Sequence, residues 1–203
     1  MVLNNVLNQQ INNEEVLEAK HIFAIDYLKL KVEITNNPLE LSQNMVIPLT
    51  KFDGEFQPLQ ESYSKQWVCG SYNDHIQIKA INKNEILIHG NLFKWLNGQN
   101  VTGTTDLIQL VLDTVNRLSQ IFNAITPTDT EIENIKLGLF RIYRIDVNKA
   151  LLFDDKQKAQ QYLSSIKEHG TYPRRDREVE KNGIYFGKGS KRTTLLYYFK
   201  GQE

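Results

Sequence analysis

Hydrophobic and polar residues alternate along the first hundred residues in the manner of β-strands. The segment from Ile25 to Ile34 carries leucine, valine or isoleucine at positions 28, 30, 32 and 34, with lysine or glutamate between them. A period of two places one set on the core side of a strand and the other in water. Four shorter segments are further strand candidates: Met45 to Leu49, Gln66 to Val68, His75 to Ala80 and Glu85 to Ile88.

The pattern changes to that of a helix after residue 104. Apolar residues then recur every three or four positions, which predicts an amphipathic helix over Thr105 to Phe122. Thr104 or Thr105 is available as its N-cap, because a threonine hydroxyl accepts a hydrogen bond from a free helix amide. A strand of mixed character follows over Leu137 to Val147.

The last third of the chain predicts one helix and one hairpin. Asp154 or Asp155 caps a helix that ends at His169-Gly170, since glycine favours a helix end. Gly183 to Gly187 and Lys191 to Lys200 flank a three-residue turn and read as a β-hairpin. The sum is an α+β fold, with a central, mostly antiparallel β-sheet and flanking helices.

Composition narrows the class of protein. The chain has 203 residues, 40% of them apolar, and no internal repeat or linker, so residues 1–203 are expected to form a single domain. A single cysteine excludes a disulfide framework and a thiolate zinc cluster. Apolar runs stay well below the roughly 20 residues of a membrane span. We therefore expect a cytoplasmic protein with no membrane partner.

Charge is unevenly distributed along the chain. From Arg174 onward it holds 8 lysines and arginines against 4 aspartates and glutamates, although the whole chain holds 24 of each kind. Such a segment can contact phosphates and release counterions, but a solvated charged hairpin is equally compatible with it. The cations predicted to contact DNA are Arg174, Arg175, Arg177, Lys188, Lys191 and Arg192, together with Lys94.

The last strand carries the residues best suited to chemistry. Alternation places Tyr198 and Lys200 on one face and Tyr197 on the other. A tyrosine hydroxyl beside an ammonium group, with carboxylates nearby for a divalent cation, can attack a phosphodiester. Cross-strand packing of aromatic residues is the alternative explanation for these tyrosines.

Several segments resemble filamentous-phage replication initiators of the gene II/X type. The run from Lys94 to Leu107 resembles their K-x-L-x-G-H-N-V-x-G-T-T-D-L segment, with glutamine in place of the histidine. Arg144-Ile145-Asp146 is similar to their R-I-D strand, and Arg192 to Lys200 resembles their R-T-L-x-x-Y-x-K strand. Ile184 to Gly187 is similar to the aromatic-glycine hairpin of plasmid initiators that replicate by the rolling-circle mechanism. The resemblance covers about Asp74 to Glu203.

The resemblance implies a metal-dependent enzyme that nicks and rejoins one strand of a replication origin, with a fold related to the HUH endonucleases. By position, Tyr198 corresponds to the family's tyrosine and Lys200 to its lysine. Asp146 and Glu203 correspond to its acidic residues, and His89 completes the set that we expect to bind Mg²⁺ or Mn²⁺. Tyr197 and Tyr185 remain alternative nucleophiles.

Further expectations follow from this resemblance. Asp146 and Tyr198 should lie on one face of adjacent or next-but-one strands. The partners would be single-stranded or hairpin origin DNA and a host helicase, in the cytoplasm of a bacterial cell. The chain ends on its motif glutamate, which suggests a catalytic domain excised from a longer protein. A non-catalytic DNA-binding module and a structural protein with core tyrosines are the rival interpretations.

Overall fold

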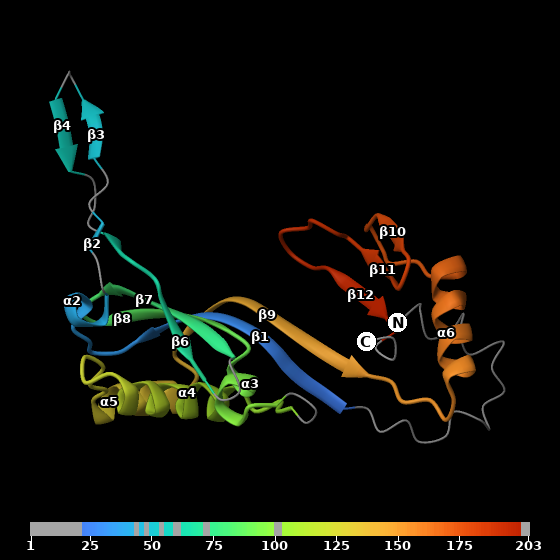
Figure 1. Cartoon of the computed structure of the whole chain (residues 1–203), viewed down its shortest axis with the longest axis horizontal. Coiled ribbons are helices and arrows are strands. Elements are labelled where there is room, and N and C mark those ends of the chain that lie inside the picture. Colours follow the sequence, from blue (N-terminus) through green and yellow to red (C-terminus); the bar gives the residue numbers. More distant parts are fainter. Residues whose placement is uncertain are drawn as a thin grey trace. The chain divides into compact units, whose positions relative to one another are not determined.

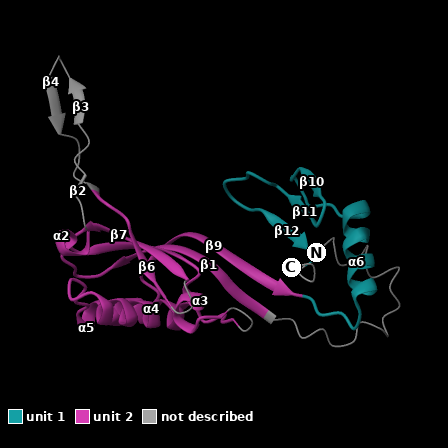
Figure 2. Cartoon of the chain, viewed as in Figure 1, with its two compact units in different colours: residues 1–21, 151–203 teal, residues 22–150 magenta. Residues whose placement is uncertain are grey.

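The computed structural model describes residues 22–42, 45–46, 49–52, 55–58, 62–70, 74–99 and 103–199. The chain separates into two compact units (Figure 2). Unit 2 is Ile22–Ala150, and unit 1 combines Met1–His21 with Leu151–Glu203. Each unit is described by itself below. That both units form one catalytic domain stays a prediction.

Unit 2 is built around a five-stranded sheet in the order β6-β7-β8-β1-β9, and every neighbouring pair is antiparallel. The strands are β1 (Ile22–Glu33), β6 (Gln66–Cys69), β7 (His75–Asn82), β8 (Glu85–Gly90) and β9 (Arg141–Ala150). The four segments that alternation predicted in this sheet before residue 91 are thus confirmed. So is the α+β fold class with its mostly antiparallel sheet.

Three helices of unit 2 gather on one side of this sheet (Figure 1). The helices on this side are α3 (Leu92–Asn97), α4 (Leu107–Ile121) and α5 (Asp129–Lys136), whereas the short helix α2 (Pro38–Leu41) lies apart from them. The apolar stripe of α4 joins the inward-facing strand residues in one core. Its fully buried members include Leu28, Leu30, Ile76, Ile78, Ile86, Ile88, Val111 and Leu118.

The first residue of α4 is Leu107, two residues after the predicted start at Thr105. Its N-cap is Asp106, whose carboxylate accepts a hydrogen bond from the backbone amide of Gln109 at 2.9 Å. Thr104, predicted as a cap, instead accepts a hydrogen bond from the amide of Asp106 at 3.0 Å. A carboxylate near the helix N-terminus also interacts favourably with the helix dipole, which explains the choice.

Helix α5 and the start of β9 correct the sequence analysis between residues 128 and 141. Thr128 and Glu131 form a capping box that begins α5, a helix that was not predicted. Residues 137–140, predicted as strand, form a turn in which Gly138 has φ of 75°. Glu131 also accepts hydrogen bonds from the amide and hydroxyl of Thr35 at 2.8 Å, which ties α5 to the end of β1.

Short elements lie between β1 and β6. Helix α2 (Pro38–Leu41) buries Leu41 in the core of unit 2. Two small ribbons follow, one pairing β2 (Met45–Val46) with β5 (Ser62–Tyr63) and the other β3 (Leu49–Phe52) with β4 (Glu55–Pro58). The strand predicted over Met45 to Leu49 is therefore divided between β2 and β3.

In unit 1, residues 151–199 form one helix and a three-stranded sheet. Helix α6 (Lys156–His169) is capped by Asp155 and ends before Gly170, as predicted. The sheet has the order β10-β11-β12, with β10 (Arg177–Glu180), β11 (Gly183–Phe186) and β12 (Leu195–Tyr198). Its small core is formed by Ile184 and Phe186 against Ile166 of α6.

The predicted hairpin exists, but its turn is longer than three residues. Residues 187–194 connect β11 to β12. The hydroxyl of Ser190 accepts hydrogen bonds from the amides of Arg192 and Thr193, so these amides are not available to the ladder. Strand β10, which pairs with β11, was not predicted. None of the described helices is long and apolar enough to span a lipid bilayer.

Candidate functional site

The five-stranded sheet has one face packed on the helices of unit 2 and one face turned away from them (Figure 1). On the second face, which we call the outer face, the register aligns one residue from each strand. Trp67 lies opposite Gln77, Gln77 opposite His89, His89 opposite Lys29, and Lys29 opposite Arg144. We call these five residues the outer row. Backbone pairing therefore gathers side chains from five distant segments on one surface.

Four side chains at one end of the outer face form a connected network. The hydroxyl of Tyr27 lies 3.0 Å from Nδ1 of His89. The guanidinium of Arg144 lies 4.8 Å from the centre of the Tyr27 ring, which is a cation–π contact. Asp146 accepts two hydrogen bonds from Arg144, at 2.8 and 2.6 Å. His89 and Asp146, both predicted as metal ligands, thus share this face through Tyr27 and Arg144.

His89 is held in its neutral form at neutral pH. Burial lowers the pKa of its imidazole, and the positive charges of Lys65 and Lys29 lower it further. A neutral imidazole has one nitrogen lone pair available. When the Tyr27 hydroxyl accepts from Nδ1–H, Nε2 is the free nitrogen, which is the form in which histidine binds metals.

The carboxylate of Asp146 is bound by Arg144 and, among the described residues, is not part of a metal ligand set. Both of its carboxylate oxygens accept from Arg144, and this carboxylate raises the pKa of the Arg144 guanidinium. Within the described part of the chain, no group of three His, Cys, Asp or Glu side chains is arranged to hold a metal ion. The described residues alone therefore do not fit a divalent cation. Glu203, the third predicted ligand, lies outside them, as does Lys200.

The expectation that Asp146 and Tyr198 lie on neighbouring strands is wrong. Asp146 is on β9 of the five-stranded sheet, whereas Tyr198 is on β12 of the three-stranded sheet in unit 1. Both segments have strand patterns, but such a pattern does not specify which sheet a strand joins. Helix α6 and strand β11 form a separate small core with β12, and this core holds β12 in its own sheet.

Tyr198 and Tyr197 point to opposite faces of β12, as alternation predicts. The side chain of Tyr198 is 50% exposed. Tyr197 packs against the unit 1 core, with its ring 6.3 Å from that of Phe186 in an edge-to-face contact. Burial, together with the charge of Tyr197, raises the pKa of the neighbouring Tyr162 hydroxyl. Tyr198 is the more accessible of the two predicted nucleophiles on this strand.

The exposed face of the three-stranded sheet places further polar groups beside Tyr198. Tyr198 lies opposite Gly183, and Gly183 lies opposite Glu180 on β10. Lys188 contacts the carboxylates of Glu178 and Glu180 at 2.6 and 2.5 Å, and these two contacts raise its pKa. The Lys188 ammonium also lies 4.9 Å from the centre of the Tyr185 ring. Lys188, predicted to contact DNA, is thus already paired with two carboxylates.

The other predicted DNA-binding cations have varied surroundings. Lys94 forms an ion pair with Asp74 at 2.6 Å. Arg177 donates to the backbone carbonyl of Glu168 at 3.1 Å, and Arg175 is half-buried beside Gly187. Arg174, Lys191 and Arg192 are in exposed positions.

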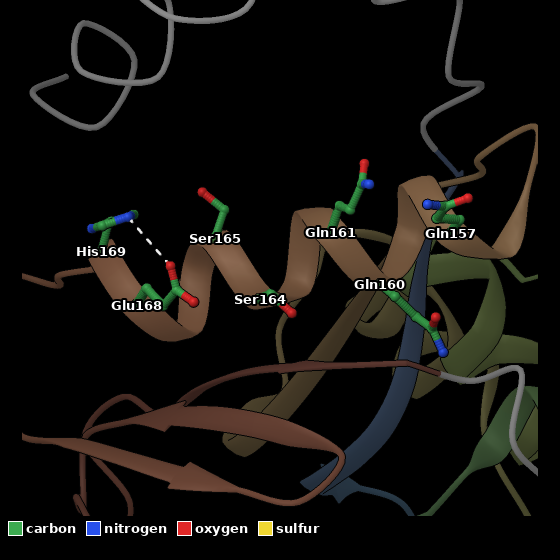
Figure 3. A pocket seen from close by; sticks show the side chains of 7 residues that line it. All are labelled: Gln157, Gln160, Gln161, Ser164, Ser165, Glu168 and His169. Carbon is green, nitrogen blue, oxygen red and sulfur yellow. Dashed lines mark ion pairs between the residues drawn. The ribbon is translucent and has the colours of Figure 1, made fainter.

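A shallow polar hollow of about 360 Å³ runs along α6 (Figure 3). Its lining consists of glutamine and serine side chains with Glu168 and His169, which form an ion pair at 3.5 Å. None of the residues predicted for catalysis, metal binding or DNA contact lines it. Its position follows from the polar face of the helix.

Four residues that contact predicted site residues were not identified from the sequence. Two of them lie on the outer face of unit 2 and two on the exposed face of the three-stranded sheet. Tyr27 and Arg144 connect His89 to Asp146, while Glu178 and Glu180 hold Lys188. The period-two pattern of β1 places Tyr27 with Lys29 on the polar side, and Arg144 stands in the R-I-D motif. Neither signal identifies Tyr27 as the link, because its contacts with His89 and Arg144 join strands that are far apart in sequence.

Comparison with known proteins identifies the family of the chain. Residues 24–203 match the family described as the N-terminal region of the phage gene II replication-associated protein, and the chain belongs to this family. It is 26% identical over 151 residues to the replication-associated protein of the same type from Enterobacteria phage I2-2. That match covers 70% of this chain and 43% of the relative, so the chain spans less than half of the relative's length. No solved structure matches, and the relation to HUH endonucleases stays a prediction.

Proposed function

We propose that the protein initiates rolling-circle DNA replication by cutting one strand of an origin through a covalent tyrosine intermediate. The observation that carries the proposal is the exposure of Tyr198 on β12, in a chain of the replication-associated protein family, while the adjacent Tyr197 is packed inward. Attack on a bulky phosphodiester requires an accessible hydroxyl. Tyr198 meets this requirement, and Tyr185 on the same face is the alternative.

The reaction is an exchange of phosphodiester bonds. The phenolic oxygen of Tyr198 attacks phosphorus, and its proton leaves to a base. The bond between phosphorus and the 3′ oxygen breaks, and that oxygen takes up a proton to become a free 3′-hydroxyl. The 5′-phosphate stays on tyrosine. Rejoining is the reverse attack by a 3′-hydroxyl, so no external energy source is needed.

DNA binding is proposed to involve the exposed cations of unit 1 and Arg144 of unit 2. A phosphate offers two oxygens to the guanidinium in the same forked arrangement as a carboxylate. A phosphate that replaces Asp146 at Arg144 would therefore release both oxygens of Asp146. This exchange would couple DNA binding to the availability of a predicted metal ligand.

Mg²⁺ or Mn²⁺ is part of the proposal, with His89, Asp146 and Glu203 as its ligands. Carboxylate oxygens and a neutral imidazole suit these cations. A bound cation would stabilise charge on the phosphate. We further propose origin DNA, single-stranded or as a hairpin, as the substrate, a host helicase as partner, and the bacterial cytoplasm as the site of action.

The proposal is tested by trapping the covalent adduct. The 203-residue chain is incubated with Mn²⁺ and 3′-labelled single-stranded origin DNA, and labelled protein is separated under denaturing conditions. Tyr198→Phe should form no adduct, whereas the matched variant Tyr197→Phe should retain it. Adduct formation by Tyr198→Phe but not by Tyr185→Phe would move the nucleophile to Tyr185. Binding without any adduct in the wild-type chain would indicate a non-catalytic origin-binding module.

A further inference from the structure

The outer face of the five-stranded sheet has the composition of a surface that binds single-stranded nucleic acid. Its outward-facing side chains include five cations and three acids along β1, β7, β8 and β9. Two of the acids, Glu85 and Asp146, are already paired with Lys31 and Arg144. The cations are Lys29, Lys31, Lys79, Arg141 and Arg144, and the third acid is Glu33.

The strand register places the cations of the outer face in two neighbouring rows. The outer row carries Lys29 and Arg144 on neighbouring strands. The adjacent row runs through Lys79, Leu87, Lys31 and Arg141 in register. These neighbouring cations produce a positive field on the outer face. A polyanion is the ligand that such a field attracts.

Trp67 is the aromatic residue at the far end of the outer row. Its side chain is 67% exposed, although burying a tryptophan would be strongly favourable. The ring meets His75 edge-on, with centroids 6.3 Å apart and an angle of 86° between the planes. This perpendicular contact orients the indole, and the exposure of Trp67 leaves most of its ring surface available. A flat, oriented and exposed aromatic face is what an unpaired base stacks upon.

We propose that the outer face binds single-stranded DNA, with one unpaired base stacked on Trp67 and the backbone directed along the outer row toward Arg144. At a strand spacing of about 4.8 Å the row is roughly 19 Å long, which accommodates several nucleotides. The polar groups of Gln77 and His89 lie between the aromatic and the cations. A duplex hides its base faces, so this surface favours an unpaired strand. The inference rests on the proposed function, and it assigns that function a contact surface outside the basic C-terminal segment.

Intrinsic fluorescence tests this directly, because the chain has only two tryptophans and they differ in exposure. Trp95 is 2% exposed in the core of unit 2, whereas Trp67 is exposed. A thymidine oligonucleotide without an origin sequence should quench the emission of the full chain as it binds. Trp67→Phe should abolish the quench but keep most of the affinity, measured by anisotropy of a labelled oligonucleotide. Trp67→Ala should weaken binding by roughly 5- to 100-fold, the range for loss of one stacked base.

Two controls separate stacking from general effects. Lys29→Ala should reduce the salt dependence of binding, whereas Lys136→Ala on α5, away from this face, should not. Circular dichroism confirms that each variant is folded. A full-affinity Trp67→Ala protein would overturn the proposal, as would quenching by a duplex in preference to the single strand.

The failure of this inference and that of the proposed function are distinguishable. All binding is measured without divalent cation and with the Tyr198→Phe protein, which should form no adduct. If the wild-type chain forms no adduct but the quench occurs, the outer face binds DNA and the nicking function is wrong. If the adduct forms but neither Trp67 variant changes quench or affinity, the nicking function holds and the outer face is not the contact surface.

Discussion

Gly183 lies directly opposite Tyr198 in the three-stranded sheet, and the absence of a side chain at Gly183 leaves the room that β12 occupies. A Cβ at this position would stand 2.5 Å from the carbonyl oxygen of Tyr197 and 3.2 Å from Cβ of Tyr198. Neither the backbone oxygen nor Cβ can rotate away. A strand glycine at such a close approach fixes the position of the residue that faces it.

Replacing Gly183 should therefore displace Tyr198. We expect Gly183→Ala to destabilise unit 1 and to lower the yield of covalent adduct at saturating DNA. Gly138→Ala is the matched control in unit 2, since a Cβ there meets nothing within 4 Å. Its left-handed φ of 75° costs about 1 to 2 kcal/mol, but Tyr198 should not move. Equal adduct yields from both alanine variants would contradict the role of Gly183.

The cations of unit 1 should differ in their contribution to DNA binding. Lys191 and Arg192 are exposed, whereas Lys188 is held by Glu178 and Glu180. Replacing Lys191 and Arg192 together by alanine should flatten the log–log dependence of affinity on salt by roughly 1.5 to 2 units. Lys188→Ala should change this slope less. A larger effect of Lys188→Ala would mean that DNA displaces the two glutamates.

Divalent cations should control adduct formation. A chelator should abolish it, and Mg²⁺ or Mn²⁺ should restore it. Asp146→Ala should lower the adduct yield in a way that extra Mn²⁺ partly restores, because one carboxylate ligand is lost. Full activity in chelator would remove the metal from the proposal, whatever the effect of Asp146→Ala.

Acid should weaken unit 2 partly through Glu85. Hydrogen bonds from Lys31 and Asn82 lower the pKa of the Glu85 carboxyl, despite partial burial that raises it. A pKa that is lowered by folding contributes stability above the unfolded value, and this contribution is lost as pH falls through the folded value. Urea denaturation between about pH 3 and 6 should show a shallower acid loss for Glu85→Gln. Identical pH profiles for the two proteins would exclude this carboxyl as a source of acid sensitivity.

Local sequence patterns predicted which segments form helices and strands better than they predicted which strands pair with each other. Alternation identified β1, β7 and β8 because each buries one face only, and the apolar stripe identified α4. Helix α5 was missed although its capping box, Thr128 and Glu131, is legible in the sequence. With a single buried position, its hydrophobic periodicity is too weak to compete.

The candidate site residues were also predicted from local patterns, whereas their contacts were not. Alternation separated Tyr198 from Tyr197, but only the packing of Tyr197 on Phe186 determines which of the two is exposed. The motif around Asp146 indicated a strand, but the motif does not reveal that Arg144 engages both oxygens or that Tyr27 lies beneath this guanidinium. The contact between Arg144 and Tyr27 depends on strand register between distant segments, which a local pattern does not encode.

The pairing of β1 with β9 has a consequence for how the protein folds. Tyr27 and Asp146 lie opposite each other although they are 119 positions apart in the chain. Closing so long a loop is entropically costly, so this contact should form after the nearby hairpin of β7 and β8. Pulse-labelled hydrogen exchange should find β9 amides protected later than those of β8. During synthesis, the network around Tyr27 cannot exist until β9 has left the ribosome, and the nascent chain should lack the outer row until then.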